Sequence, residues 1–461
     1  MTEILETVNQ FVWGIPALIL IVGVGLYLSI RTGFAQFTLF PRALRMFVSR
    51  LRGRKAADNE ISPYRALCTA LAATVGTGNL AGVAGAITIG GPGSVFWMWI
   101  CAFLGMVTKY AEATLAVRYR IRNKDGEHVG GPMYMICNGL GKKWTWLAGL
   151  YCFFGVVAAF GVGNATQINA VISGVNSAIG ALGGEETKVG NFILGIALAL
   201  LIAVMLLGGA KRIGRIAEML VPFASALYLA LGIGVLCIRS SAIPGALTMI
   251  FRGAFSPRAV TGGVLGSAFS ALRVGASRGV FTNEAGMGTA SIAHAAANVE
   301  HPAEQGLMGI MEVFLDTIVI CTMTALVILC SGTQIPYGND IGAALTSQAF
   351  SEVYGQWICI PIALALCCFA IATVLGWGLY GARCAQYLFG ENAWRPFVYL
   401  QVVTVVLGAI MKTGTVWMLS EIVNGLMAIP NLLALAWLSP VLISLTKEYL
   451  KNYIANYPQK S

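Results

Sequence analysis

Charged residues are scarce in this sequence. Aspartate, glutamate, lysine and arginine together make up 11% of its 461 residues, whereas a typical soluble domain contains about 25%. A soluble protein of this length could not cover its surface with so few charges, and 57% of the residues are hydrophobic. The outer surface must therefore face an apolar medium. The composition predicts a polytopic α-helical membrane protein and excludes disordered, collagen-like and disulfide-stapled chains.

Histidine and paired cysteine motifs are also scarce. The 11 cysteines include no C-x-x-C pair, and most lie within apolar stretches, where we expect reduced core residues. A G-x-S-x-G pattern at 275–279 has only His128, His294 and His301 as possible bases and lacks the strand-turn-helix setting of a nucleophile elbow. The glycines of 76–82 miss the dinucleotide fingerprint by one residue. Neither an enzyme nor an organic cofactor is therefore expected.

Long apolar runs, in contrast, are abundant. A bilayer core needs roughly 20 apolar residues per helix, and the sequence predicts eleven such spans in a single all-α transmembrane domain. The first is not expected to be a cleavable signal, because the residues before it carry Glu3 and Glu6 and no basic residue. The predicted spans cover approximately residues 11–31, 64–90, 93–117, 146–180, 190–209, 214–238, 259–277, 305–330, 357–383, 395–412 and 415–445.

Lysine and arginine alternate between the two sides of these spans. Of the 30 basic residues, 24 fall in connections on one side, as an outside N-terminus and a cytoplasmic C-terminus require. The largest connection, 32–63, is predicted to be a basic amphipathic helix or surface arm on the cytoplasmic face. The distribution of the basic residues behind the net charge of +10 therefore indicates how the chain is oriented in the plasma (inner) membrane. No nucleic-acid partner is expected.

The second span contains a glycine-rich interruption. Gly76, Thr77, Gly78 and Asn79 lie near the middle of an apolar stretch, where glycine weakens a helix. An unwound point at this depth would offer amide donors to a carboxylate and carbonyl acceptors to a cation. Gly78 and Gly82 also form a small-x-x-x-small pair, so close helix packing explains the segment equally well.

The seventh span is expected to be the second interrupted helix, because Gly262, Gly263 and Gly266 precede a serine-containing stretch. The two halves, 64–238 and 259–445, then each begin with a broken helix and enter the membrane from opposite faces. This 5+5 inverted repeat, preceded by one extra helix, is typical of a secondary transporter whose site lies at the membrane midplane. A channel would instead repeat a pore loop or a ring of charges.

Polar side chains also occur in spans four and nine. Asn164 and Gln167 share one helix face, as do Thr373 and Trp377. A pocket lining is one interpretation of these residues. Hydrogen bonding between helices for the amides and core packing for Trp377 are the alternatives.

Acidic residues within the spans are few. Glu312 and Asp316 are four residues apart in span eight, and Lys109 and Glu112 are three apart in span three, where they could form a simple ion pair. Asp316 and Glu421 are candidate proton or cation ligands. A neutral, hydrogen-bonded acid is an equally good interpretation of each.

Three long motifs resemble the signatures of one transporter family. They cover 76–84, 90–99, and 282–288 with its continuation through 293–297. In this order they are similar to the alanine/glycine:cation symporter family of the amino acid–polyamine–organocation superfamily, which has the leucine-transporter fold. The resemblance runs from about span one to span eleven. It implies Na⁺-coupled, or sometimes H⁺-coupled, uptake of alanine or glycine.

The resemblance also implies two cation sites. The Thr74 carbonyl and the Asn79 side chain would contribute to a site beside the substrate. The carbonyls of Ala72 and Val75, with the Thr373 hydroxyl, would form the second site between two helices. Neutral oxygen ligands of this kind suit a partly dehydrated Na⁺.

The same resemblance implies the substrate contacts. The amides of Thr77 and Gly78 would hold the carboxylate, with Asn79 and Thr373 close by. Gln167 stands where the fold often has a substrate-contacting tyrosine. Three bulky residues would close the side-chain pocket and restrict it to one or two carbons: Phe160, Phe269 and Trp377.

These expectations combine into a monomeric Na⁺ symporter for alanine or glycine, in which spans two, three, seven and eight rock against the rest. A proton-coupled permease or exchanger that relies on Asp316, Glu312 or Glu421 is the main alternative, followed by a channel or a membrane-embedded sensor. The segment 282–297 is expected on the cytoplasmic face. It would act there as an inner gate whose Arg278 or Glu284 meets the basic arm, or as a cap on span eight.

Overall fold

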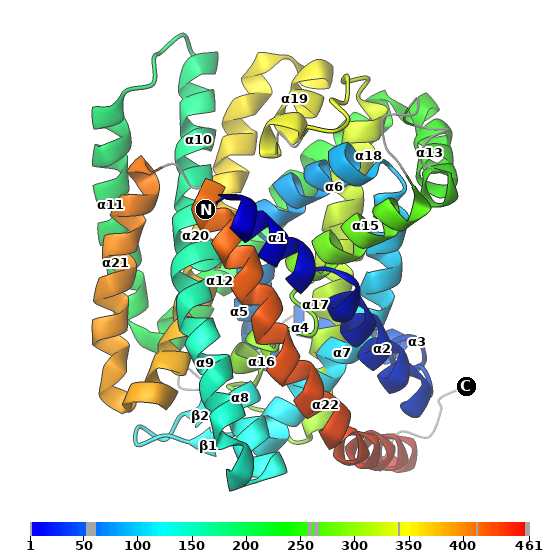
Figure 1. Ribbon diagram of the computed structural model, residues 1–461, viewed down its shortest axis with the longest axis vertical. Coiled ribbons are helices and arrows are strands. Elements are labelled where there is room, and N and C mark those ends of the chain that lie inside the picture. Colours follow the sequence, from blue (N-terminus) through cyan, green and yellow to red (C-terminus); the bar gives the residue numbers. More distant parts are fainter. Residues whose placement is uncertain are drawn as a thin grey trace.

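The computed structural model describes residues 2–51, 61–256, 261, 267–339, 342–411 and 414–456. These residues are almost entirely helical, which confirms the predicted all-helical class. Two short strands, β1 (Ile121–Arg122) and β2 (His128–Val129), pair antiparallel. This hairpin lies at one end of the long axis of the molecule, and α19 (Ala343–Tyr354) lies at the other end (Figure 1).

The elements of the first half of the chain are α1 (Thr2–Val12), α2 (Ile15–Arg31), α3 (Ala35–Thr38), α4 (Phe40–Leu51), α5 (Pro63–Thr74), η1 (Gly78–Gly82), α6 (Val83–Gly90), α7 (Ser94–Tyr119), α8 (Pro132–Met135), η2 (Ile136–Leu140), η3 (Lys142–Trp144), α9 (Thr145–Phe160), η4 (Gly161–Ala165), α10 (Thr166–Ala181), α11 (Lys188–Leu207) and α12 (Gly209–Ile238). Those of the second half, besides α19, are η5 (Ser240–Ala242), α13 (Ile243–Phe255), α15 (Ala268–Asn283), α16 (Thr289–His294), α17 (Pro302–Val313), η6 (Phe314–Cys321), α18 (Thr322–Cys330), η7 (Gln356–Ile358), α20 (Cys359–Phe389), η8 (Glu391–Ala393), α21 (Trp394–Ile410) and α22 (Gly414–Asn456).

The membrane-length helices follow the predicted spans closely. Among the described residues, eight helices are long and apolar enough to cross a bilayer, and the bent pair Pro63–Thr74 and Gly78–Gly90 makes a possible ninth. These nine correspond to predicted spans two to six and eight to eleven. The predicted first span contains a shorter apolar helix, Pro16–Arg31. The count of eleven spans and the inverted repeat remain predictions.

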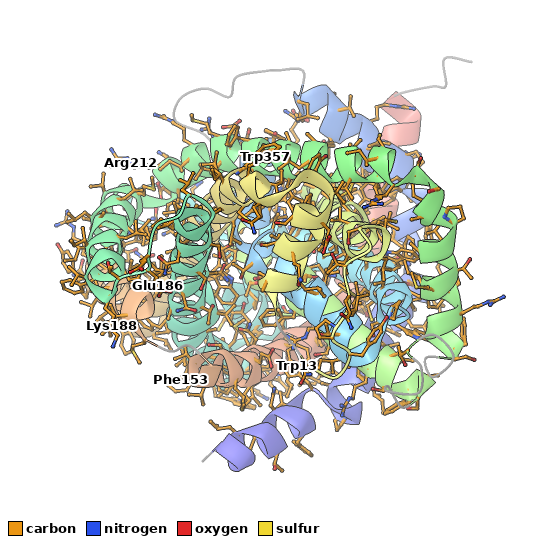
Figure 2. All side chains as sticks on the ribbon, turned by 90° about the horizontal axis from the view of Figure 1, so that it is seen from above. Trp13, Phe153, Glu186, Lys188, Arg212 and Trp357 are labelled. Carbon is orange, nitrogen blue, oxygen red and sulfur yellow. The ribbon has the colours of Figure 1, made fainter. Side chains whose placement is uncertain are left out.

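The outside of the helix bundle is apolar, as a lipid-facing surface must be. Leu200 of α11, Met219 of α12 and Leu400 of α21 are each more than half exposed. Helices α11 and α21 pack side by side along one edge of the molecule (Figure 1). Polar connections lie beyond the helix ends: Glu186 and Lys188 mark the α10–α11 connection in the view from above (Figure 2). This distribution fits a protein whose waist is surrounded by hydrocarbon.

The helix described in the seventh predicted span, α15, continues beyond the end that the sequence suggested. Helix α15 starts at Ala268, where the Ser267 hydroxyl caps it by accepting the Ser270 amide at 3.2 Å, and it continues to Asn283. The predicted glycine interruption at 262–266 lies outside the described residues. Arg278, which we assigned to a cytoplasmic connection, therefore sits within a helix.

Several elements were not predicted. Helices α13 and α19 occupy two stretches that the sequence analysis treated as plain connections, and α13 packs against α7 and α15. Both are shorter than a bilayer span, so the search for long apolar runs passes over them. The described part of the predicted basic arm forms α3 and α4, and its residues 52–60 lie outside the described part of the chain.

Candidate cation and substrate site

The second predicted span is interrupted at residues 75–77, where its glycines indicated, and this interruption is the first break. Helix α5 ends at Thr74, Val75 is extended (φ −80°, ψ 98°), and the π-helical turn η1 begins at Gly78. The two helical pieces are bent by 54° relative to each other. The packing alternative also holds in part, because a Cβ atom on Gly78 or Gly82 would lie 3.6 Å from Thr282 Cγ2.

This first break frees backbone carbonyls at the end of α5. In a continuous helix the Gly76 amide would donate to the Ala72 carbonyl, but here it donates to Asn79 Oδ1 at 2.8 Å. The Val75 amide keeps its helical partner, the Leu71 carbonyl, at 2.7 Å. The carbonyls of the last turn, from Ala72 onward, therefore lose their helical donors. They are the kind of oxygen ligand that Na⁺ takes at an unwound membrane helix.

Thr373 of α20 lies directly against the first break. A Cβ atom built on Gly76 would come within 2.5 Å of Thr373 Oγ1, so this approach requires glycine. The Thr373 hydroxyl donates to the Phe369 carbonyl at 3.0 Å, and its oxygen lone pairs can accept a further partner. The fold thus brings together the end of α5 and Thr373, the two parts of the predicted second cation site.

Asn79 connects the first break to α17–α18 through a buried carboxylate. Its Nδ2 donates to Asp316 Oδ1 at 2.6 Å and to Cys321 Sγ at 3.3 Å. Asn79 and Asp316 are both completely buried. Because Oδ1 of Asn79 also accepts the Gly76 amide, one side chain fixes the broken backbone and the carboxylate together.

The network continues from Asp316 to the end of α15. The Thr317 hydroxyl donates to Asp316 Oδ2 at 2.8 Å, and Asn283 Nδ2 donates to Thr317 Oγ1 at 3.1 Å. Asn283 Oδ1 then accepts the Ala285 amide at 3.0 Å. Sequence reasoning singled out Asp316 but missed Asn283 and Thr317, because nothing in the local sequence shows that they lie near span two.

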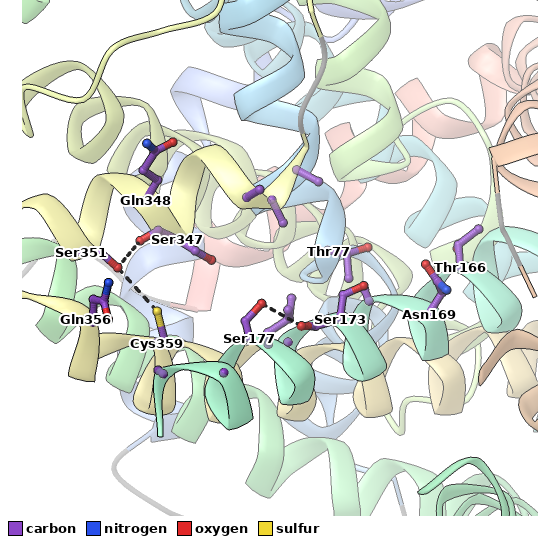
Figure 3. Close-up of a pocket in the computed structure, with 18 residues that line it drawn as sticks. Thr77, Thr166, Asn169, Ser173, Ser177, Ser347, Gln348, Ser351, Gln356 and Cys359 are labelled. Atoms are coloured by element: carbon purple, nitrogen blue, oxygen red, sulfur yellow. Dashed lines mark hydrogen bonds between the residues drawn. The ribbon is translucent and has the colours of Figure 1, made fainter. Parts of the chain in front are cut away.

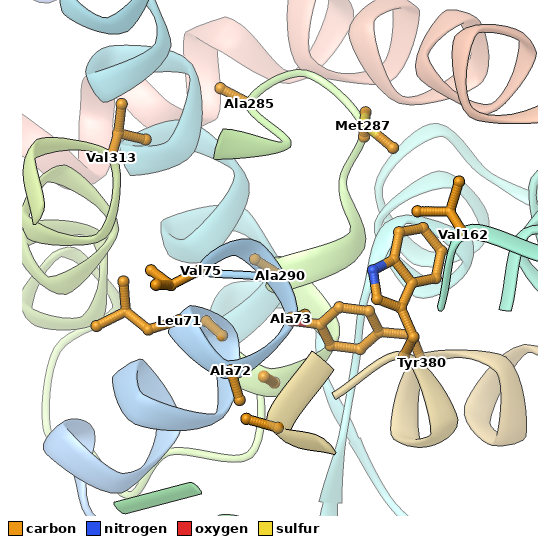
Figure 4. Close-up of a cluster of buried hydrophobic side chains, with 14 of the residues drawn as sticks. Leu71, Ala72, Ala73, Val75, Val162, Ala285, Met287, Ala290, Val313 and Tyr380 are labelled. Atoms are coloured by element: carbon orange, nitrogen blue, oxygen red, sulfur yellow. The ribbon is translucent and has the colours of Figure 1, made fainter. Parts of the chain in front are cut away.

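A second helix break, which the sequence analysis did not predict, follows Asn283. Glu284, Gly286 and Gly288 all adopt positive φ values (54°, 94° and 78°), so α15 cannot continue into α16. The placement of 282–297 on the cytoplasmic face remains a prediction, and Ala285, Met287 and Ala290 of this segment are fully buried beside the first break (Figure 4). The G-x-G spacing of 286–288 repeats that of 76–78 and could have indicated this break.

Gln167 of α10 contacts Thr77 in the first break. The Thr77 hydroxyl donates to Gln167 Oε1 at 3.0 Å, and Gln167 Nε2 donates to the Val162 carbonyl at 3.1 Å. Both side chains are almost fully buried. Span four therefore does contact the unwound segment, through the amide that the sequence analysis selected.

The three bulky residues predicted to close the pocket are not brought together. Trp377 is buried one turn beyond Thr373, against Gly163, where a Cβ atom would be 2.6 Å from the indole Cγ. Phe160, however, packs on Phe397 of α21 with ring centroids 5.1 Å apart, because the π-helical turn η4 that follows it shifts the faces of α9 and α10. Phe269 is 53% exposed at the first turn of α15.

Asn164 belongs to helix packing rather than to the site. Its Nδ2 donates to the Gln401 carbonyl at 2.9 Å and contacts Gln401 Oε1. This contact joins η4 to α21. The alternative of hydrogen bonding between helices is therefore the correct one for Asn164.

A water-accessible vestibule leads to the first break. A cavity of about 680 Å³ runs between α10, α19 and the start of α20 and reaches Thr77 (Figure 3). Among the described residues, its polar lining consists of hydroxyls, amides and a thiol and includes no charged side chain; the labelled members are Thr77, Thr166, Asn169, Ser173, Ser177, Ser347, Gln348, Ser351, Gln356 and Cys359. A lining of this kind suits a neutral polar solute.

The remaining acidic candidates are held in ion pairs. Glu421 Oε1 accepts from Arg278 Nη1 at 2.8 Å. Glu312 lies 3.3 Å from Lys109 Nζ, and Glu112 lies 3.8 Å from it. These contacts favour the structural interpretation of Glu421 and Glu312.

Sequence comparison identifies relatives over the whole chain. A model of the sodium:alanine symporter family matches residues 1–460. The sodium/alanine symporter AgcS of Methanococcus maripaludis is 42% identical over 454 residues, which cover 97% of each chain. An uncharacterized transporter of Haemophilus influenzae is 42% identical over 460 residues, or 99% of this chain and 97% of that one. The probable sodium/glutamine symporter GlnT of Bacillus subtilis is 35% identical over 458 residues, or 98% and 92%.

Structural comparison gives the fold. The crystal structure of MhsT in complex with L-phenylalanine superposes with a TM-score of 0.58 and covers 86% of this chain and 99% of that chain. The two sequences are only 15% identical, so the match shows the shared fold alone.

Proposed function

Because the chain belongs to the sodium:alanine symporter family, we propose that it imports alanine or glycine together with Na⁺. Its family and relatives are transporters, which confirms the expectation that it is not an enzyme. The observation that carries the proposal is the first break. There Gly76 lies against the Thr373 hydroxyl, and the Gly76 amide donates to the Asn79 side chain instead of to the Ala72 carbonyl.

The cation sites are assigned to these oxygens. The carbonyls of Ala72 and Val75 with Thr373 Oγ1 would hold one Na⁺. The Thr74 carbonyl and Asn79 would contribute to a second ion beside the substrate. The Asn79–Asp316 hydrogen bond of 2.6 Å supports this second assignment, because it keeps a carboxylate close to the ion and fixes the Asn79 amide.

The substrate is assigned to the start of η1. Amides in the first turn of a helix lack intrahelical acceptors and suit an anionic group, so Thr77 and Gly78 would bind the carboxylate of the amino acid. The uncharged vestibule supports a zwitterion over a charged solute. Trp377, which fills the space beside Gly163, supports a side chain of no more than one or two carbons.

Transport would proceed by alternating access, in a monomer in the plasma membrane with its N-terminus outside and its C-terminus in the cytoplasm. The vestibule reaches Thr77 from the α19 end, while Ala285, Met287 and Ala290 are buried on the other side of the breaks. This asymmetry supports a conformation that is open toward the α19 end. In the proposed cycle, Na⁺ orders the first break and the substrate completes the site before the molecule opens on the other side.

Counterflow in proteoliposomes tests this proposal. Vesicles loaded with unlabelled alanine should accumulate radiolabelled alanine in Na⁺, and accumulation should fall to the level of empty vesicles when choline replaces Na⁺. Uptake that follows an imposed pH gradient in choline would instead support the proton-coupled alternative. Flux that does not saturate would support a channel.

A further inference from the structure

The loop between the two helices of the second break is held by one carboxylate and one amide. Oε1 of Glu112, from α7, accepts the Gly286 amide at 2.9 Å and the Gly288 amide at 3.1 Å. It also accepts Asn431 Nδ2, from α22, at 2.7 Å. The same Asn431 nitrogen donates to the Gly286 carbonyl at 2.9 Å. Asn431 therefore bonds both to the loop and to the Glu112 carboxylate that holds the loop.

A buried charge cluster keeps Glu112 in place. Lys109 Nζ lies 3.8 Å from Glu112 Oε2 and 3.3 Å from Glu312 Oε1. Glu312 Oε2 lies 2.7 Å from His294 Nε2, so the cluster also holds the end of α16. All four side chains are completely buried, and a buried charge is tolerated only when it is paired. The Glu112 carboxylate is thus held in the interior by groups of α7 and α17 and is not a mobile surface group.

Asn431 alone of these groups belongs to a helix outside the predicted moving bundle. Glu112 lies in predicted span three, and Gly286 and Gly288 lie in the loop between predicted spans seven and eight, whereas α22 corresponds to span eleven. The loop is also tightly enclosed, because a Cβ atom on Gly288 would overlap the Pro132 ring and approach Asn431 Oδ1 to 2.6 Å. Separation of the loop from α22 on the side away from the vestibule must break the two Asn431 hydrogen bonds.

We propose that Asn431 is a positioning residue for transport. Its amide latches the second break to α22, closes the molecule on the side away from the vestibule, and releases when the cargo leaves on that side. This inference rests on the proposed function, since it assigns the step at which the symporter opens inward. Its test must therefore work in the absence of Na⁺ and amino acid.

The test measures the exposure of a cysteine behind the loop. Ala290 in α16 is fully buried next to the first break (Figure 4), and Ala290→Cys gives a reporter there. The purified full-length protein is labelled with a hydrophilic maleimide in detergent, and each cysteine is quantified by peptide mass spectrometry. Asn431→Ala removes both hydrogen bonds, one of them to a carboxylate, so labelling at 290 should become about 10- to 100-fold faster.

A matched variant and an internal reference cysteine distinguish the loss of the Asn431 hydrogen bonds from a general loosening of the fold. Asn424 lies two turns earlier on α22 and is also buried, so Asn424→Ala should leave the rate at 290 unchanged. Cys152 of α9 is fully buried and should not label faster in Asn431→Ala. Asn431→Leu retains a similar side-chain volume, loses the donor, and should also expose position 290. Equal rates at 290 with and without the Asn431 amide, or equal acceleration at Cys152, would overturn the proposal.

Discussion

Replacement of Asn79 by alanine is expected to weaken Na⁺ binding and alanine binding together, each by roughly 10- to 100-fold. The side chain is completely buried and accepts the Gly76 amide at 2.8 Å. It also donates to Asp316 at 2.6 Å. Its removal leaves the buried Gly76 amide without its acceptor and Asp316 Oδ1 without its Asn79 donor, and each such loss costs about 1–3 kcal/mol. The first break then loses the geometry that both ligands need.

The Asn79→Ala prediction is checked by alanine binding at several Na⁺ concentrations. Asn164→Ala is the matched control, because Asn164 is an equally buried amide in a π-helical turn that bonds to Gln401 instead of to the site. The control is expected to lower thermal stability and to keep both affinities within a few-fold. If Asn79→Ala lowered thermal stability but left both affinities within a few-fold, as expected for the control, Asn79 would be a packing residue.

Removal of the Thr373 hydroxyl should have the second largest effect. Thr373→Val keeps the shape of the side chain but takes away the oxygen that lies against Gly76. We expect the Na⁺ concentration for half-maximal alanine binding to rise by about tenfold or more, since one cation ligand is lost. The affinity for alanine at saturating Na⁺ should change much less, because the substrate amides belong to η1.

Thr373→Ser is the control for this variant. Serine keeps the oxygen and loses only a methyl group, so its Na⁺ dependence should stay within about threefold of the parent protein. Equal behaviour of the valine and serine variants would show that the hydroxyl does not coordinate the ion.

The membrane fold was largely predictable because hydrophobicity is a local property. Nine predicted spans have counterparts of nearly the same bounds among the described helices. The first break was predictable for a similar reason, since Gly76 and Gly78 interrupt an apolar run. The break at 284–288 was not predicted, because the polar residues of 282–288 suggest a connection at the membrane surface. In the fold, Glu284 bonds to Thr289 and Asn283 bonds to Thr317, so these polar groups are satisfied in the interior.

The contacts that assemble the site could not be derived in the same way. Asn79 and Asp316 are 237 residues apart, and their hydrogen bond depends on how two breaks face each other. The vestibule depends on α19, a helix too short to register as a span. Phe160 was expected in the pocket because of its bulk, but it packs on Phe397 of α21. Thr373 and Gln167 stood out as polar side chains within apolar spans, and the family resemblance then suggested their roles.

Equilibrium linkage between the ion and the amino acid tests the central claim most directly. Calorimetry would give the affinity for alanine in Na⁺ and in choline, and the affinity for Na⁺ with and without alanine. If both ligands share the first break, Na⁺ raises the affinity for alanine, and alanine raises the affinity for Na⁺ by the same factor. We predict a common factor of about ten or more. Equal affinity for alanine in Na⁺ and in choline would contradict the account.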